Sequence, residues 1–224
     1  MKRILNKLPL ILLSTTLFFS TVVFSEPPNL SLLKHEIRKY HDSGLYQHEL
    51  AHVIHKAQQF IVQQAIGNQK HQPPQKLAIV LDIDETSLSN YQFMDKRDFT
   101  GTKEQYHQEI MAANAPAIKP TLALYQDAIR HGVKVFFVTG RHQAERKATQ
   151  KNLINAGYKH WAGLYLRPNH YRHHSIIPFK AQTRKLITEQ GYTIVATIGD
   201  QYSDLKGGYA EKGFKLPNPF YYLP

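Results

Sequence analysis

The stretch that decides the fold is Leu77-Ala78-Ile79-Val80-Leu81, followed directly by Asp82-Ile83-Asp84-Glu85-Thr86. The apolar residues do not alternate with polar ones, which is typical of a strand covered on both faces in a parallel sheet. Ligands of such sheets gather at the carboxyl ends of the strands, and the two aspartates stand at such an end. The sequence therefore predicts an α/β fold with a functional site after this strand.

The two aspartates of this stretch indicate phosphate chemistry. Asp82 and Asp84 are two positions apart, so in extended backbone their side chains share one side of the strand. Two close carboxylates repel each other unless a cation or a proton lies between them. Mg²⁺ prefers oxygen ligands and commonly binds together with phosphate groups. Taken alone, the pair could equally end a strand and cap the next helix.

The length and the N-terminus indicate one exported domain. The chain has 224 residues, 42% of them hydrophobic, which is enough for one core. Residues 1–25 carry three basic residues, Lys2, Arg3 and Lys7, and continue with an apolar stretch that serines and threonines interrupt, as in a secretory signal peptide. We predict cleavage before Glu26, a mature domain of residues 26–224, and a secreted protein, periplasmic in a Gram-negative bacterium. An uncleaved anchor is the alternative, but the stretch is short for a membrane span.

Cysteine content and charge narrow the possible partners. The chain has no cysteine, which excludes disulfides and the cysteine that carries the lipid of a bacterial lipoprotein. We therefore expect no stable membrane anchor after cleavage. Loss of residues 1–25 would lower the formal net charge from +11 to +8. A basic surface attracts anions and nucleic acid without specificity, so we expect no specific nucleic-acid partner.

Helical and strand patterns alternate along the chain. Helices are predicted at 46–64, 120–130, up to residue 157 and at 178–191, and strands at 77–81, 133–138, 164–166 and 193–198. This order predicts a parallel sheet with right-handed crossovers, in a Rossmann-like three-layer α/β/α sandwich. Residues 87–119 are too long for a simple loop, and we predict that they form a small, mainly helical cap inserted beside the site.

Polar residues follow three of the predicted strands and could meet at one edge of the sheet. Each group alone has an ordinary explanation, such as a turn or a helix cap. A lysine near the start of the 178–191 helix could supply a cation. The residues concerned are Asp82 and Asp84, Thr139 and Gly140, Asp200 and Asp204, and Lys180. Together they predict one site.

With these motifs the chain resembles the haloacid dehalogenase superfamily, in its secreted acid phosphatase branch of class B/C-type bacterial acid phosphatases and plant vegetative storage proteins. The resemblance spans most of the mature chain. It depends on DIDET (82–86), GVKVFFVTGR (132–141), FKAQTR (179–184), GDQYSDL (199–205) and FKLPNPFYY (214–222).

The resemblance implies a role for each candidate residue. Asp82 would attack phosphorus and form an aspartyl-phosphate. Asp84 would act as the acid and base, which requires that it hold a proton while Asp82 is ionised. Mg²⁺ would be the cofactor, bound by Asp82, the backbone carbonyl of Asp84 and Asp200. The remaining expected roles are binding of the substrate phosphate by Thr139, Gly140 and Lys180, and orientation of a metal-bound water or of Lys180 by Asp204.

Several roles stay open at this stage. Arg141 could pair with an acid or reach the substrate. Asn218, Tyr221 and Tyr222 could serve the site or only pack the C-terminal tail, and the cap aromatics could stack on a nucleobase or form cap core. The expected function is a Mg²⁺-dependent acid phosphatase for nucleoside monophosphates and other small phosphate esters. The alternatives are phosphotransfer to alcohols and a non-enzymatic basic storage or anion-binding protein; a homo-oligomer is compatible with either.

Overall fold

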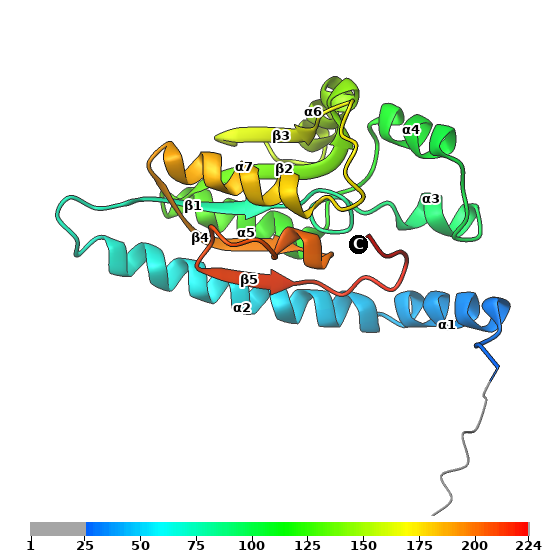
Figure 1. Ribbon diagram of the computed structural model, residues 1–224. Helices are drawn as coiled ribbons and strands as arrows, with labels where there is room; N and C mark the ends of the chain where they lie inside the picture. The colour runs from blue at the N-terminus through cyan, green and yellow to red at the C-terminus, as the bar shows by residue number, and fades with distance from the viewer. Residues whose placement is uncertain (1–25, 224) are drawn as a thin grey trace, which may run out of the picture.

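The centre of the molecule is a parallel sheet of five strands in the order β3-β2-β1-β4-β5, in a computed structural model that describes residues 26–223. Figure 1 shows the strands pointing in one direction with helices on both sides. The strands are β1 (Lys76–Leu81), β2 (Lys134–His142), β3 (Gly163–Arg167), β4 (Tyr192–Gly199) and β5 (Lys212–Lys215).

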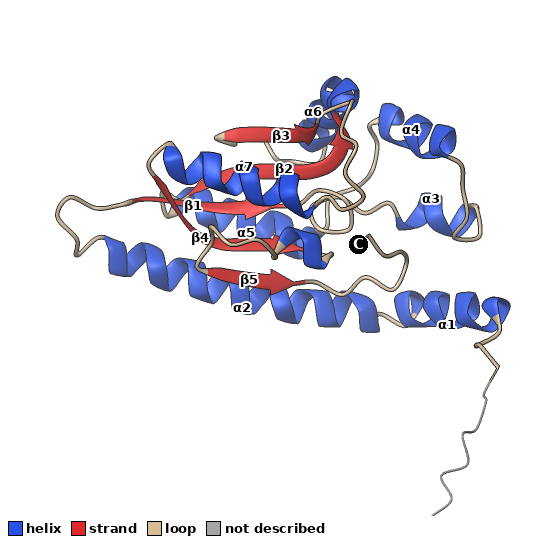
Figure 2. Cartoon of the chain, in the orientation of Figure 1, coloured by secondary structure: helices blue, strands red, loops and turns tan. Residues whose placement is uncertain are grey.

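Helices connect the strands in the alternation that the sequence predicts, as Figure 2 shows. The helices are α1 (Leu30–Asp42), α2 (Leu45–Asn68), α3 (Tyr91–Lys96), α4 (Lys103–Ala112), α5 (Lys119–Arg130), α6 (Arg146–Asn155) and α7 (Ile177–Glu189), with short 3-10 helices η1 (Gln143–Glu145) and η2 (Tyr202–Asp204). The predicted α/β class with a parallel sheet is confirmed. The sequence did not predict α1 as a separate helix or the edge strand β5.

Side chains of β1 point alternately into two apolar layers. Leu77, Ile79 and Leu81 belong to one core cluster, which continues into α2 and α5. Ala78 and Val80 belong to a second cluster, which continues into α7. Both faces of the strand are therefore buried, which explains why its sequence is apolar without alternation.

The order in which the chain adds strands to the sheet changes side at β1. This strand pairs with β2 on one side and with β4 on the other, so that Leu81 lies level with both Phe137 and Ile198. The next backbone N–H, that of Asp82, still donates to the carbonyl of Ile198 at 3.0 Å. Such a reversal opens a crevice at the carboxyl ends of the strands, and the residues after β1 and β4 lie at it.

Residues 87–119, the predicted cap, contain α3 and α4, which Figure 1 shows beyond the carboxyl ends of the strands. Thr102 and Gln105 close the first turn of α4 with reciprocal side-chain to backbone hydrogen bonds of 2.8 and 3.3 Å. Arg38 of α1 holds α3 through an ion pair of 2.6 Å with Asp95. The helical content agrees with the prediction, and the cap as a unit of its own stays a prediction.

The helix predicted at 46–64 is present as α2, and one turn separates it from α1. Gly44 has a φ of 84° and separates α1 from α2. The histidines of this part of the chain are divided between the two helices. His48, His52 and His55 of α2 are exposed, whereas His41 of α1 stacks on Tyr91 with ring centroids 3.3 Å apart.

The predicted signal peptide, residues 1–25, lies outside the described residues. Within residues 26–223 no helix combines the length and the apolar character needed to cross a bilayer. Cleavage before Glu26 and the absence of an anchor after cleavage stay predictions.

Candidate active site

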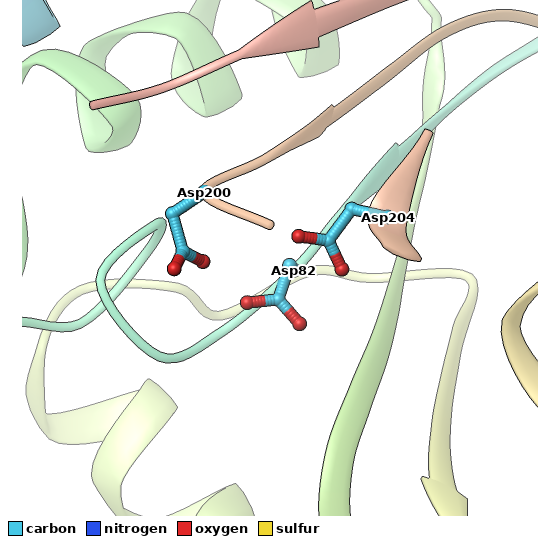
Figure 3. Close-up of side chains that lie close together, drawn as sticks. All are labelled: Asp82, Asp200 and Asp204. Atoms are coloured by element: carbon cyan, nitrogen blue, oxygen red, sulfur yellow. The ribbon is translucent and has the colours of Figure 1, made fainter. Parts of the chain in front are cut away.

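Three acidic side chains meet at the carboxyl edge of the sheet, as Figure 3 shows. Asp82 follows β1, Asp200 follows β4, and Asp204 ends η2. All three are buried, and one carboxylate oxygen of each lies within 4.8 Å of those of the other two. The structure thus brings together the predicted nucleophile, the predicted metal ligand at the end of β4 and the predicted supporting acid.

Lys180 of α7 lies between two of these acids, as the sequence predicted for the cation of the site. Its Nζ donates to Asp82 Oδ1 at 2.8 Å and also to Asp204 Oδ1. Burial alone would lower the pKa of the ammonium group, but Asp204 and then Asp82 raise it above its usual value. Lys180 is therefore held in its charged form.

The charges of this cluster do not balance. Three carboxylates and one ammonium group leave a formal charge of −2 in a buried site if all are ionised. Burial, followed by repulsion from Asp204, raises the pKa of Asp82 well above its usual value. The same two causes raise the pKa of Asp200 to about 6. Buried oxygen ligands with a charge of −2 fit a hard divalent cation such as Mg²⁺.

Hydrogen bonds from three different segments orient the carboxylate of Asp200. Its Oδ1 accepts from Thr86 Oγ1 at 3.1 Å, and its Oδ2 accepts from Gln201 Nε2 at 2.7 Å and from Asn218 Nδ2 at 2.6 Å. The sequence left the role of Asn218 open; in the structure its side-chain amide contacts the carboxylate of Asp200 directly. Partners of this kind fix the direction of a metal ligand and commonly change metal affinity when they are removed.

Asp204 is held by the tight turn after β4. The backbone N–H of Gln201 donates to Asp204 Oδ2 at 2.9 Å. A Cβ at Gly199 would lie 2.2 Å from the Cβ and Oδ2 of Asp204, so that only glycine leaves room for this carboxylate. The predicted contact of Asp204 with Lys180 is present.

Asp84 does not join the three other acids, because Arg141 at the end of β2 binds it. Arg141 Nη2 donates to Asp84 Oδ1 at 2.7 Å, and Arg141 Nε lies 3.1 Å from both oxygens. Asn90 Nδ2 adds a hydrogen bond of 2.9 Å. The predicted metal contact through the backbone carbonyl of Asp84 does not need this carboxylate and stays a prediction. Arg141 pairs with an acid, one of the two roles left open for it.

The pKa values of Asp82 and Asp84 are shifted in directions opposite to those expected. Burial opposes ionisation of Asp84, but the guanidinium group outweighs it and lowers the pKa of that carboxyl below its usual value. The pKa of Asp82, by contrast, is raised. The sequence led us to expect a protonated Asp84 beside an ionised Asp82. With Arg141 bound to Asp84, the two pKa directions run opposite to that expectation, and the roles of the two aspartates stay predictions.

The two predicted phosphate-binding residues of β2 have different surroundings. Thr139 is fully buried, and its Oγ1 accepts from the backbone N–H of Arg141 at 3.1 Å. Gly140 lines the cavity together with Asp82 and Lys180. The structure thus brings the backbone of Gly140 to the predicted site, while the buried Thr139 is not among the residues that line the cavity.

Glu85, the fourth residue of the DIDET motif, lines the same cavity as Asp82 and Asp84. Its backbone has a φ of 53°, and its buried carboxylate accepts from the N–H of Asn90 at 2.6 Å and from the hydroxyl of Tyr221 at 3.0 Å. Burial first, and then Asp84 and Asp200, raise the pKa of Glu85 to about 8. In the sequence, only the position of Glu85 within the DIDET motif indicates that it lies near the site. Its partner Tyr221 is 136 residues away in the chain, so no local pattern reveals their contact.

Comparison with known proteins agrees with this geometry. Residues 28–224 match the family model of HAD superfamily, subfamily IIIB (Acid phosphatase). The chain belongs to this subfamily. The resemblance to the haloacid dehalogenase superfamily stated from the motifs is therefore confirmed.

Relatives of this subfamily IIIB member carry the names acid phosphatase, stem glycoprotein and vegetative storage protein. It is 36% identical over 148 residues to acid phosphatase 1 of Solanum lycopersicum, a match that covers 64% of this chain and 58% of the relative. It is 37% identical over 154 residues to the stem 28 kDa glycoprotein of Glycine max, covering 66% and 61%. The chain thus matches about three fifths of the length of these relatives.

One solved structure shares most of the fold of this subfamily IIIB chain. The class C acid phosphatase from Bacillus anthracis superposes with a TM-score of 0.67 over 86% of this chain and 85% of that chain, at 21% identity. At this identity the likeness supports the parallel-sheet fold alone.

A cavity of about 1020 Å³ opens from the acidic cluster toward the predicted cap of this subfamily IIIB chain. It is lined by Asp82 and Lys180 at one part and by Tyr106 of α4 at another. Tyr91, in contrast, belongs to the apolar core, and Phe93 packs against that core. Among the cap aromatics that we considered for stacking, Tyr106 is therefore the one that lines the cavity.

Proposed function

We propose that this chain hydrolyses small phosphomonoesters through an aspartyl-phosphate on Asp82, with Mg²⁺ as its cofactor. One observation carries the proposal: Asp82, at the end of β1, is contacted by Lys180 and lies within a buried cluster with Asp200 and Asp204. Membership of the acid phosphatase subfamily supports the same reaction.

The first step is attack by a carboxylate oxygen of Asp82 on the phosphorus atom. A bond forms between that oxygen and phosphorus, and the bond from phosphorus to the ester oxygen breaks. Lys180 orients Asp82 through the 2.8 Å hydrogen bond and adds positive charge where the phosphoryl group is held. The backbone at Gly140, which lines the same cavity, supplies further donors.

Asp84 supplies the proton in the first step and removes one in the second. It protonates the leaving ester oxygen and then takes a proton from the water that attacks the aspartyl-phosphate, which releases inorganic phosphate. In the structure Arg141 and Asn90 hold Asp84 at the cavity wall. To act as an acid, Asp84 has to exchange the contact with Arg141 for a proton.

Mg²⁺ fits the donor set of the site. Asp82 and Asp200 would bind it through carboxylate oxygens and Asp84 through its carbonyl, while Asp204 would hold Lys180 or a metal-bound water. When bound, the ion would offset the charge of the cluster and of the substrate phosphate.

The finer parts of the proposal concern substrate and location. A cavity of about 1020 Å³ is much larger than a phosphate group and can accept a nucleoside monophosphate or another small ester. The pattern of residues 1–25 supports export from the cytoplasm.

A panel of phosphate esters, assayed with Mg²⁺ and with excess chelator, tests the proposal. We expect phosphate release from phenyl phosphate and from nucleoside 5′-monophosphates, loss of release on chelation, and recovery when Mg²⁺ is restored. Addition of alcohols measures the share of phosphoryl transfer. No release by the folded, Mg²⁺-loaded protein would contradict the proposal and favour a storage or anion-binding role, as the names of relatives such as vegetative storage protein 2 of Arabidopsis thaliana suggest.

A further inference from the structure

The cavity contains a second cation away from the acidic cluster. Arg167 ends β3 and lines the same cavity as Asp82 and Lys180. Every other arginine that lines this cavity has a carboxylate partner: Arg141 pairs with Asp84, and Arg97 pairs with Glu109. Within residues 26–223 Arg167 has no carboxylate within ion-pair distance.

Most hydrogen-bond donors of Arg167 are unused. Its Nη2 lies 2.6 Å from His142 Nε2, which is its one hydrogen bond to the described part of the protein. Its Nε is buried and has no acceptor among the described residues. A guanidinium group has five N–H donors in a planar fork that matches the oxygens of phosphate. A buried donor without an acceptor is costly unless a ligand satisfies it.

The neighbours of Arg167 leave its charge uncompensated. Burial, followed by the charge of Arg167, lowers the pKa of His142, so that His142 is a neutral acceptor. Glu145 lies close to His142, but its carboxylate already accepts from the N–H of His142 at 2.7 Å and contacts His107 Nδ1 at 2.9 Å. Glu145 also lines the cavity, but both of its carboxylate oxygens are engaged, so Arg167 is left as a cation without a carboxylate partner among the described residues.

The register of the sheet sets the separation from the catalytic centre. β1, which delivers Asp82, is separated from β3 by β2, and Arg167 pairs in register with His142 at the end of β2. Two strand spacings correspond to about 10 Å, and Arg167 lies two positions further along the sheet than Asp82, so the two backbone positions are roughly 12 Å apart. A phosphate on Asp82 and an anion on Arg167 would thus be joined by a short carbon skeleton.

We propose that Arg167, supported by His142, binds a second phosphate group of the substrate, so that the preferred substrates are small molecules with two phosphate groups on one carbon skeleton. This proposal rests on the proposed phosphatase function and deepens it. Only the phosphate at Asp82 is hydrolysed; the phosphate at Arg167 is recognised and stays on the product.

A series of alkanediol bisphosphates of increasing chain length tests the distance between the two phosphate positions. Each bisphosphate is compared with the alkyl monophosphate of the same chain length by its kcat/KM with Mg²⁺. We expect a preference of at least about tenfold for the bisphosphate at one chain length, falling for shorter and longer chains, because one charge-assisted contact contributes about that factor. A ratio near one at every chain length would overturn the proposal.

Variants assign the preference to Arg167. Arg167→Gln should reduce the ratio to about one, Arg167→Lys should restore part of it, and Arg172→Gln is the matched control, because Arg172 is exposed and does not line the cavity. If Arg167→Gln keeps the wild-type ratio, the proposal is overturned, even if the kcat/KM values for the bisphosphate and the monophosphate both change.

Binding measurements separate this proposal from the phosphatase function. Calorimetry with non-hydrolysable alkane bisphosphonates and monophosphonates needs no turnover. A bisphosphonate preference that Arg167→Gln removes would support the second site even if the protein hydrolysed no ester. Hydrolysis of monoesters without any such preference would leave the phosphatase function intact and overturn the second site.

Discussion

Arg141 and Asp84, 57 positions apart in the chain, form an ion pair of 2.7 Å in which the arginine side chain is 2% exposed and the aspartate side chain 27% exposed. The pair joins the end of β2 to the loop after β1. It also keeps Asp84 away from the cluster of Asp82, Asp200 and Asp204. Its contribution to stability and its effect on catalysis can be measured separately.

We predict an energetic coupling between Arg141 and Asp84. In a double-mutant cycle of Arg141→Met and Asp84→Asn, measured by urea unfolding without metal, the coupling should be roughly 1–2 kcal/mol, because one partner is partly exposed to solvent. The surface pair Arg130 and Asp127 is the control and should show almost none, since the Arg130 side chain is 66% exposed. Additive effects at Arg141 and Asp84 would show that the pair is not formed in solution.

We predict that Mg²⁺ stabilises the folded protein. The buried cluster is left with a formal charge of −2, so a cation that binds it stabilises the folded state by about 2.7 kcal/mol at a hundredfold excess over its Kd. For a chain of this size the Tm should rise by roughly 5–10 °C in a thermal unfolding experiment. Asp200→Asn should abolish the rise.

Asn218 provides a finer test of the same site. Its side chain touches Asp200 without belonging to the acidic cluster, so Asn218→Ala should weaken Mg²⁺ affinity by about tenfold or more without removing it. Tyr222→Ala is the matched control in the same tail, since Tyr222 is 73% exposed. Equal Mg²⁺ affinities of Asn218→Ala and the wild type would show that the amide does not orient the ligand.

We predict that His142 makes stability depend on pH. Its pKa is lowered in the folded protein, by burial and by Arg167. Between that lowered pKa and the ordinary value of about 6.5, the unfolded chain binds more protons at this residue, so its contribution to stability is lost as pH falls. Urea unfolding from about pH 7.5 to about pH 5 should show the wild type losing stability relative to His142→Gln. Parallel curves for the two proteins would contradict the prediction.

Sequence patterns predicted the strands that deliver the site, and the resemblance predicted the contact of Asp204 with Lys180, but most other contacts of the site were not predicted. The strand before Asp82 is a continuous apolar run, and the strand before Asp200 is apolar apart from two threonines, which indicates burial on both faces. The edge strand β5, Lys212–Lys215, has four residues, two of them lysines, and therefore has no such pattern. Length and apolar content reveal central strands more readily than edges.

Most contacts between residues that are distant in the chain could not be predicted from the sequence. Arg141 follows a recognisable motif, but its partner depends on how the loop after β1 turns, which no local pattern encodes. Asn218 lies 18 positions beyond Asp200 and reaches it only because the tail after β5 returns to the site. Arg167 has no motif at all; its interest comes from unused donors, which appear only when its surroundings are known.

The sharpest prediction separates the roles of Asp82 and Asp84, whose side chains are chemically identical. Asp82→Asn should abolish both turnover and phosphoenzyme, because an amide does not attack phosphorus. Asp84→Asn keeps the nucleophile, so an aryl phosphate with a good leaving group should still phosphorylate Asp82, while hydrolysis of the intermediate loses its base. Rapid-quench measurements should show a burst followed by slow turnover in Asp84→Asn.

The chemical nature of the trapped species decides between the two aspartates. An acyl phosphate is stable in acid and is cleaved by hydroxylamine, so these two properties identify a phosphorylated carboxylate. Peptide mapping of the quenched Asp84→Asn protein should locate the label at Asp82. An acyl phosphate trapped on the Asp82→Asn protein would mean that another carboxylate is the nucleophile, whereas a burst followed by full-rate turnover in Asp84→Asn would remove Asp84 from its role as the base.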